Sequence, residues 1–349
     1  MFTLTNLSAK QRPIERGITL QVITPNMLLK KTVLLGGLCL ATAPWCLAQT
    51  WPEKPVRVMA PSNAGGPPDL YARALADHFA KALGQPFVVE TSPAAGGMIA
   101  AQAVLRAAAD GYTLLVNTAG MMTITPNANP KANYKGDDFT LICQGVETTL
   151  VLASHPSITA KNYAELATWI KGQKVPPTYS SYSPGSPAHF LGYQLGEALK
   201  VDMAHVPYKS SPSQVTDMVG GTAPLGFVQI ATAGPHVKAG KLTAYATTGA
   251  QRSPQMPDVP TLAELGLPQL TTTVWFGFSG PKNLPAPVVK RLIDAHQQMV
   301  ISPEFKTRMA TAGLNPAPDV CGDKFLAKIN QETARWGRVV KATGFSSDN

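Results

Sequence analysis

Short apolar runs alternate with amphipathic segments along the first half of the chain. The runs Val56 to Ala60 and Phe87 to Glu90 are strand-like, and the segments Asp69 to Leu83 and Met98 to Ala108 repeat apolar residues at helical spacing. The next run, Thr113 to Asn117, completes a βαβαβ order. This order predicts a parallel sheet that binds ligands at the carboxyl ends of its strands.

A second unit of the same kind begins near Asn162. Apolar runs at 178–181, 204–206, 225–230 and 242–247 predict strands, with helical patterns between them. A returning strand at 271–279 and three C-terminal helices are expected to pack on the first unit. We therefore predict an α/β protein of two lobes, each a mixed, mostly parallel sheet flanked by helices, with a ligand cleft between them. The lobes would comprise residues 49–152 with 275–349, and residues 153–274.

Residues 27–48 have the pattern of an export signal. Two lysines precede the apolar run 32–43, and small residues near Ala48 suit a signal peptidase. The run falls short of the roughly 20 apolar residues of a membrane span, which favours cleavage after Ala48 over a retained anchor. Residues 1–26 are interpreted as an upstream extension. The prediction is a soluble chain exported to the periplasm.

Charge and cysteine content narrow the function classes. Removal of residues 1–48 takes five Lys/Arg and one Glu from a chain of 349 residues and charge +9, which leaves 301 residues and +5. This charge forms no basic run, which argues against nucleic-acid binding and suits a small anionic ligand. Cys143 and Cys321 remain, and two buried free thiols are expected, although an oxidising compartment allows a disulfide. The six histidines lack metal-ligand spacing, so neither a metal nor a cofactor is expected.

Two glycine-rich loops lie at the predicted ligand edge. Each follows a strand and opens a helix, where backbone amides bind carboxylate or phosphate without a basic side chain. The alternative is a pair of tight turns that need glycine only for its backbone angles. Because both loops share one edge, anion capture is favoured. Asp69 is expected to brace Arg73 on the helix. The loop residues concerned are Ser62, Asn63, Ala64, Gly65 and Gly66, and Gly96 with Gly97.

Motifs of common enzymes are absent from the sequence: there is no G-x-S-x-G elbow, Walker A motif or complete G-x-G-x-x-G. The nearest nucleophile set is Ser181, Ser186 and His189. Ser186 is expected to cap a helix or bind ligand, because no third group is evident to orient the histidine. We therefore predict that the chain is not an enzyme, with a secreted serine hydrolase as the alternative. The pattern is equally compatible with Lys209 facing the cleft and with Lys209 lying at a solvated strand end.

Several short motifs follow one another in order through residues 51–345. Each is weak alone, but their order is specific, and the chain resembles the solute-binding proteins of tripartite tricarboxylate transporters, often called the Bug family. The motifs include Trp51-Pro52-Glu53-Lys54-Pro55, Gly65-Gly66-Pro67-Pro68-Asp69, Asp110-Gly111-Tyr112-Thr113, Gly185-Ser186-Pro187-Ala188-His189 and Val206-Pro207-Tyr208-Lys209.

The resemblance implies a periplasmic binding protein of type II-like architecture that acts as a monomer. Such a protein closes on a small carboxylate and delivers it to the permease subunits of the transporter, or alternatively presents it to a sensor. In the family, loops from both lobes hold the carboxylate. Carried over to this chain, the ligand contacts would be Ser62, Asn63, Ala64, Gly65, Gly66, Ser181, Ser183, Gly185, Ser186, Tyr208 and Gln229, with Asp69, Gly96, Gly97 and His189 in support.

The chain departs from the family pattern at several positions, including Ser62, Thr91 and Ser183, and one further departure bears most on the ligand. Family members commonly have Asp near the position of Val228-Gln229, and this chain has none there. Loss of a carboxylate from the cleft favours an anionic ligand, because a buried like charge opposes ionisation of a second carboxyl group. We therefore expect a mono- or dicarboxylate, aromatic acids included, rather than an amino acid.

Overall fold

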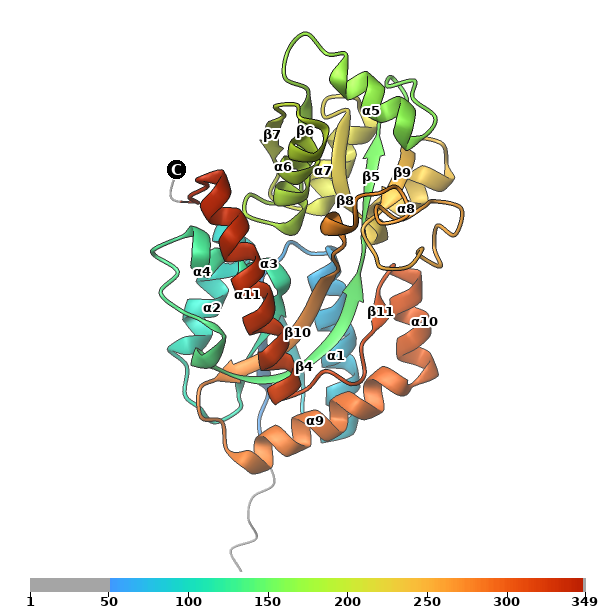
Figure 1. Ribbon diagram of the computed structural model, residues 1–349. Helices are drawn as coiled ribbons and strands as arrows, with labels where there is room; N and C mark the ends of the chain where they lie inside the picture. Colours follow the sequence, from blue (N-terminus) through green and yellow to red (C-terminus); the bar gives the residue numbers. More distant parts are fainter. Residues whose placement is uncertain (1–50, 348–349) are drawn as a thin grey trace, which may run out of the picture. The chain divides into compact units, whose positions relative to one another are not determined.

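The computed structural model describes residues 51–347, which contain two β-sheets flanked by helices (Figure 1). The expected export signal lies outside this range. Among the described residues, the helices lack the combination of length and apolar character that crossing a bilayer requires.

The first sheet contains the βαβαβ unit that the apolar pattern predicts. Strands β1, β2 and β3 are parallel, and β10 returns antiparallel between β3 and β4. In spatial order the strands are β11 (Asn315–Pro316), β4 (Phe139–Thr148), β10 (Val274–Pro281), β3 (Thr113–Thr118), β1 (Val56–Ala60) and β2 (Phe87–Thr91). The helices of this lobe are α1 (Pro67–Leu83), α2 (Met98–Leu105), α3 (Ala119–Thr123), α4 (Thr125–Ala128), α9 (Ala286–Ile301), α10 (Pro303–Thr311) and α11 (Asp323–Thr343).

The second sheet forms the other lobe. Strand β6 is parallel to β7 and β8, and β5 runs antiparallel between β8 and β9. In spatial order the strands are β7 (Ala204–Pro207), β6 (Thr178–Ser181), β8 (Leu225–Gln229), β5 (Leu150–Ser154) and β9 (Thr243–Thr247). Its helices are α5 (Tyr163–Lys171), α6 (Pro187–Leu199), α7 (Ser211–Val219) and α8 (Ile230–Lys238).

The chain passes from one sheet to the other at Thr149. Strand β4 ends at Thr148 and β5 begins at Leu150, yet β5 pairs only within the second sheet (Figure 1). The sheets therefore divide a few residues before the boundary at 152/153 that the sequence suggests, because the apolar pattern continues through both strands. The expected boundaries between independently moving lobes stay a prediction.

Aromatic packing fixes α1 on the first sheet. Phe79 of this helix makes edge-to-face contacts with Phe87 and Phe278, with ring centroids 5.4 and 5.6 Å apart. The buried Tyr71 ring lies against Gly145 of β4, where a Cβ atom would overlap it. Because α1 is fixed by these contacts, the loop between β1 and α1 has a defined place at the sheet edge.

The two cysteines form a disulfide, so the expectation of free thiols is wrong. Residues 320–322 run antiparallel beside β4, with Gln144 N–H donating to Val320 O (2.8 Å) and Gly322 N–H to Ile142 O (2.9 Å). This pairing brings the Cα atoms of Cys143 and Cys321 to 4.0 Å. The residues are 178 apart in sequence, and no local pattern reveals that the segment before α11 pairs with β4.

Replacing both Cys143 and Cys321 by alanine should lower the free energy of unfolding by about 2–4 kcal/mol, because the cross-link restricts the unfolded chain. Urea denaturation of the variant and of the wild type, each with and without a thiol reductant, measures the effect. The reductant should destabilise only the wild type. Two thiols labelled by maleimide in denatured wild-type protein that was never reduced would contradict the disulfide.

Candidate functional site

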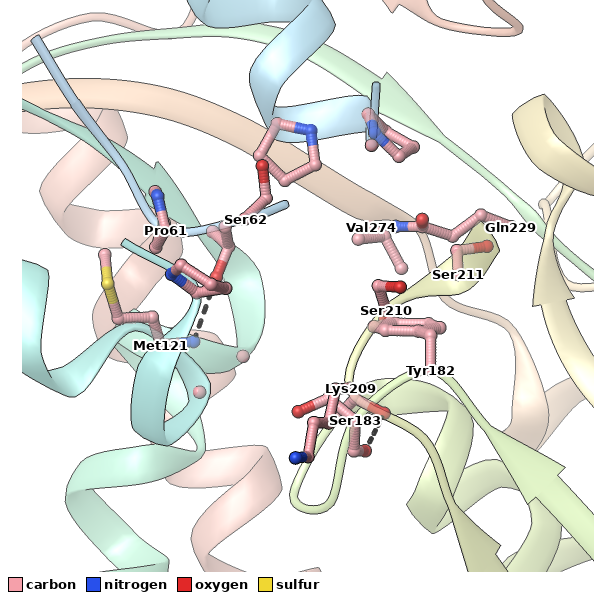
Figure 2. A pocket seen from close by; sticks show the side chains of 18 of the residues that line it. Pro61, Ser62, Met121, Tyr182, Ser183, Lys209, Ser210, Ser211, Gln229 and Val274 are labelled. Carbon is pink, nitrogen blue, oxygen red and sulfur yellow. Dashed lines mark hydrogen bonds between the residues drawn. The ribbon is translucent and has the colours of Figure 1, made fainter. Parts of the chain in front are cut away.

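A cavity lies between the two lobes, at the carboxyl ends of parallel strands from both sheets. The first lobe contributes the loops after β1, β2 and β3, and the second contributes the loops after β6 and β7 and the last residue of β8. Figure 2 shows Ser62 and Met121 on one side, facing Ser183, Lys209 and Ser210 across the cavity. Both sheets thus direct the same kind of edge to the cavity, in line with the general rule for open α/β sheets.

The loop after β1 is held by Asp69. Its Oδ2 atom accepts hydrogen bonds from Gly65 N–H (2.9 Å) and from Arg73 Nε (2.9 Å), and its side chain is buried. The expected pair of Asp69 and Arg73 is therefore present. Gly66 N–H donates to Asn63 O at 3.2 Å, so the amides of both glycines are used within the loop. Among the described residues, the amides of Asn63 and Ala64 have no partner.

Two prolines reduce the number of donors at the start of α1. Pro67 and Pro68 occupy its first turn and have no N–H groups. An anion at this helix end would therefore meet fewer amides than the glycine pattern suggests. In the loop after β2, Gly96 lines the cavity and Gly97 does not. Gly97 has φ 94°, and a Cβ there would lie 2.7 Å from Met121 Sδ, so this position supports the wall through close packing.

The loop after β6 is held by a matching set of contacts. Ser183, Gly185 and Ser186 line the cavity. Gly185 N–H donates to His189 Nδ1 at 3.2 Å, and Ser186 Oγ donates to Ser183 O at 2.6 Å. Ser186 Oγ also accepts the backbone N–H of His189 at 3.3 Å, so Ser186 is the helix cap that the sequence predicts.

Ser181 lies behind this loop rather than in the cavity wall. It is fully buried, and its Oγ donates to Ser183 O (2.9 Å) and accepts from His205 Nε2 (2.7 Å). The hydrolase alternative paired Ser181 or Ser186 with His189, whereas Ser181 is paired with His205 and Ser186 contacts the His189 backbone. In the described chain, no carboxylate is hydrogen-bonded to either ring. This arrangement supports a loop and does not resemble a catalytic triad.

The two histidines behind the loop are neutral. Their rings stack with centroids 3.8 Å apart and an interplanar angle of 14°. Burial and, to a smaller extent, the neighbouring His205 together lower the pKa of His189 to about 3. Burial likewise lowers the pKa of His205 to about 4. The Nδ1 atom of His189 is therefore available as a hydrogen-bond acceptor at neutral pH.

Lys209 is the single charged side chain in the described lining of the cavity. It is exposed to solvent just after the end of β7, and it also lines the cavity, so the structure gives it features of both environments that the sequence leaves open. Its neighbour Tyr208 instead donates to Asp217 Oδ2 at 2.7 Å and does not line the cavity. Gln229 lines the cavity with a neutral amide and is 3% exposed.

The sequence-based site and the cavity agree in part. Of the residues expected to bind or support a ligand, the cavity lining includes Ser62, Asn63, Gly66, Gly96, Ser183, Gly185, Ser186 and Gln229. The lining does not include Ala64, Gly65, Asp69, Gly97, Ser181, His189 and Tyr208.

A wall of the cavity that the sequence analysis missed comes from the turn after β3. Thr118 caps α3 by accepting Met121 N–H at 3.3 Å, and both residues line the cavity with Gly120 and Thr125. The strand order could have indicated this wall, because β3 is parallel to β1 and β2 and ends at the same edge of the sheet. In the second lobe Tyr182, Ser210 and Ser211 were also missed.

Comparison with known proteins agrees with this geometry. The model of the tripartite tricarboxylate transporter family receptor matches residues 71–345. The chain is 31% identical to the periplasmic binding protein BugD, with a TM-score of 0.78 over 85% of this chain and 99% of BugD. It is 30% identical to MatC from Rhodopseudomonas palustris with bound malate (TM-score 0.75; 83% and 100% covered). It is 26% identical to R. palustris Rpa4515 with adipate, with a TM-score of 0.79 over 85% of this chain and 99% of Rpa4515.

The family match covers most of the chain and both lobes of the structure. The two-sheet α/β architecture expected from the sequence is shared with these solved structures. The chain therefore belongs to the tripartite tricarboxylate transporter receptor family, whose members are periplasmic solute-binding proteins.

Proposed function

We propose that the chain is a periplasmic solute-binding protein that captures a small carboxylate between its lobes and delivers it to a tripartite tricarboxylate-type transporter. The charge of the residues that line the cavity is the main support for this class of ligand. Lys209 is cationic, and no aspartate or glutamate lines the cavity in the described chain. Such a wall favours an anion, because an unpaired carboxylate in the protein would oppose it.

The polar groups around the cavity suit a carboxylate. The amide of Asn63 lies in the loop after β1, and hydroxyl groups of Thr118 and Ser210 come from other loops. Backbone N–H and hydroxyl donors form charge-assisted hydrogen bonds with an ionised carboxyl group. The binding roles of Ser62, Asn63, Gly66, Ser183, Gly185, Ser186 and Gln229 belong to this proposal.

A dicarboxylate is the preferred ligand class. Gln229 provides a neutral amide where an aspartate would favour an amino group, so no carboxylate in the described lining selects for an amino acid. MatC and Rpa4515, which share the fold, were solved with the dicarboxylates malate and adipate. Groups from both lobes line the same cavity, which supports capture of a single ligand by closure of the lobes on it.

The full chain, expressed with its own leader and purified from the periplasm, should bind a dicarboxylate in a 1:1 ratio, with a rise in melting temperature. Isothermal titration against malate, adipate, succinate and benzoate measures this, after removal of any co-purified ligand by unfolding and refolding. Malamide, the neutral diamide of malate, is the matched control and should not bind. A folded sample that binds none of these acids would contradict the assignment.

Lys209→Met should weaken binding of the best acid by about ten-fold, because it removes the cationic partner while keeping most of the length of the side chain. Lys241→Met changes the net charge by the same amount at an exposed position of the same lobe outside the cavity, and should leave affinity unchanged. Equal effects of the two substitutions would show that overall charge, and not the cavity, determines affinity.

Delivery to a permease is tested by uptake of the radiolabelled acid. Cells lacking the gene should lose uptake, and the wild-type gene should restore it more fully than the Lys209→Met gene at low ligand concentration. Uptake that is unchanged, together with a changed transcriptional response to the acid, would support the sensor alternative over transport.

A further inference from the structure

The two main cavity loops, one from each lobe, are built in the same way. Residues 63–69 follow β1, and residues 183–189 follow β6. The third residue of each is a glycine with positive φ, 78° at Gly65 and 66° at Gly185. The amide of the fourth residue donates back to the carbonyl of the first, at 3.2 Å in one loop and 3.3 Å in the other. A proline then begins each helix, Pro67 or Pro187.

The last residue of each loop segment holds its glycine. Gly65 N–H donates to Asp69 Oδ2 at 2.9 Å, and Gly185 N–H donates to His189 Nδ1 at 3.2 Å. Asp69 is 1% exposed and His189 is 9% exposed, and neither lines the cavity. Two different residue types therefore make the same hydrogen bond at the same position in the two lobes.

We propose that Asp69 and His189 are matched positioning residues, each of which holds its loop in the shape that binds the ligand. The proposal rests on the proposed function for the identity of the ligand, but the hydrogen bonds themselves do not. Asn63 and Gly66 line the cavity beside the Asp69 anchor, and Ser183, Gly185 and Ser186 do so beside His189. Loss of either anchor would remove the hydrogen bond that holds the loop glycine. Because glycine adopts a wide range of backbone angles, the cavity wall formed by that loop would then lose its fixed geometry.

The two anchors also add no unpaired negative charge beside the proposed anion site. The Asp69 carboxylate is paired with Arg73, four residues further along α1. The corresponding position on α6 is Tyr193, which provides no cation, and there the anchor is a neutral histidine. His205 stacks on that histidine and is itself held to Ser181. The anchor is thus a carboxylate where a cation follows four residues later, and a neutral ring where none does.

A similar contact elsewhere in the chain shows what simple helix capping looks like. At the start of α5, Glu165 accepts the N–H of Lys161 at 2.9 Å, while Asn162 accepts the N–H of Glu165 at 3.0 Å. This is an ordinary stabilising cap at a helix that does not line the cavity. Glu165→Leu is therefore a matched control, since it removes the same kind of bond without touching the cavity.

The test compares removal of each anchor with its conservative replacement. His189→Asn keeps an acceptor oxygen near the Nδ1 position, and His189→Leu removes the acceptor. Asp69→Asn and Asp69→Leu make the same comparison in the first lobe. Each Leu variant should weaken malate or adipate binding by about ten-fold or more. The Asn variants should bind within a few-fold of the wild type, and Glu165→Leu should lower the melting temperature without changing affinity.

Amide hydrogen exchange at Gly65 and Gly185, measured without ligand, tests the hydrogen bonds independently of the proposed function. Exchange at the glycine should accelerate in the Leu variant of the same lobe and remain slow in the Asn variant. If the wild type binds no carboxylate, the proposed function fails while these exchange rates still decide the positioning role. Unchanged exchange in the Leu variants, or Leu variants that bind as tightly as the wild type, would overturn the proposal.

A further measurement covers the case in which a Leu variant fails to fold. Nitrogen-15 spectra of histidine-labelled wild-type protein identify which ring nitrogen of His189 carries the proton. The proposal requires the proton on Nε2 and a free lone pair on Nδ1 at neutral pH. A proton on Nδ1 would overturn it, because that nitrogen would then be unable to accept from Gly185.

Discussion

Two backbone hydrogen bonds, from Gly65 to Asp69 and from Gly185 to His189, hold the loops that form facing walls of the cavity. Each acceptor lies on the first turns of a helix whose packing fixes it on its own sheet. In the first lobe, Tyr71 and Phe79 anchor α1 against β4 and its neighbours. The geometry of the cavity thus depends on the cores of both lobes as well as on the hydrogen bonds within each loop.

The C-terminal segment connects this support across the lobes. Phe345, just beyond α11, packs edge-on against His189 with ring centroids 4.7 Å apart, and it also contacts Phe190 of α6. Ser347 N–H donates to Ala128 O of α4 at 3.0 Å. Residues that follow a first-lobe helix therefore touch the anchor of the second-lobe loop. Any movement of one lobe against the other must alter these contacts as well as those around the cavity.

The features that the sequence predicted correctly depend on local patterns. Alternating apolar runs and amphipathic segments identified the parallel strands and the edge at which the cavity lies. Ser186 was recognised as a cap, and Asp69 with Arg73 as a pair, because each needs only the spacing of one helix turn. In contrast, the hydrogen bond between Ser181 and His205 joins neighbouring strands, and the disulfide joins β4 to a segment 178 residues away. Such contacts depend on tertiary placement, which one sequence without an alignment does not reveal. The environment of Lys209 was undecided for the same reason.

The central claim is that a carboxylate is held between the two anchored loops. A crystal structure of the chain with malate or adipate tests it most directly. The account predicts that the bound acid lies in this cavity with a carboxylate group within hydrogen-bond distance of the Asn63 amide, and with Gly65 and Gly185 still bonded to their anchors. Ligand density outside this cavity, or a bound acid whose carboxylates contact neither loop, would contradict it.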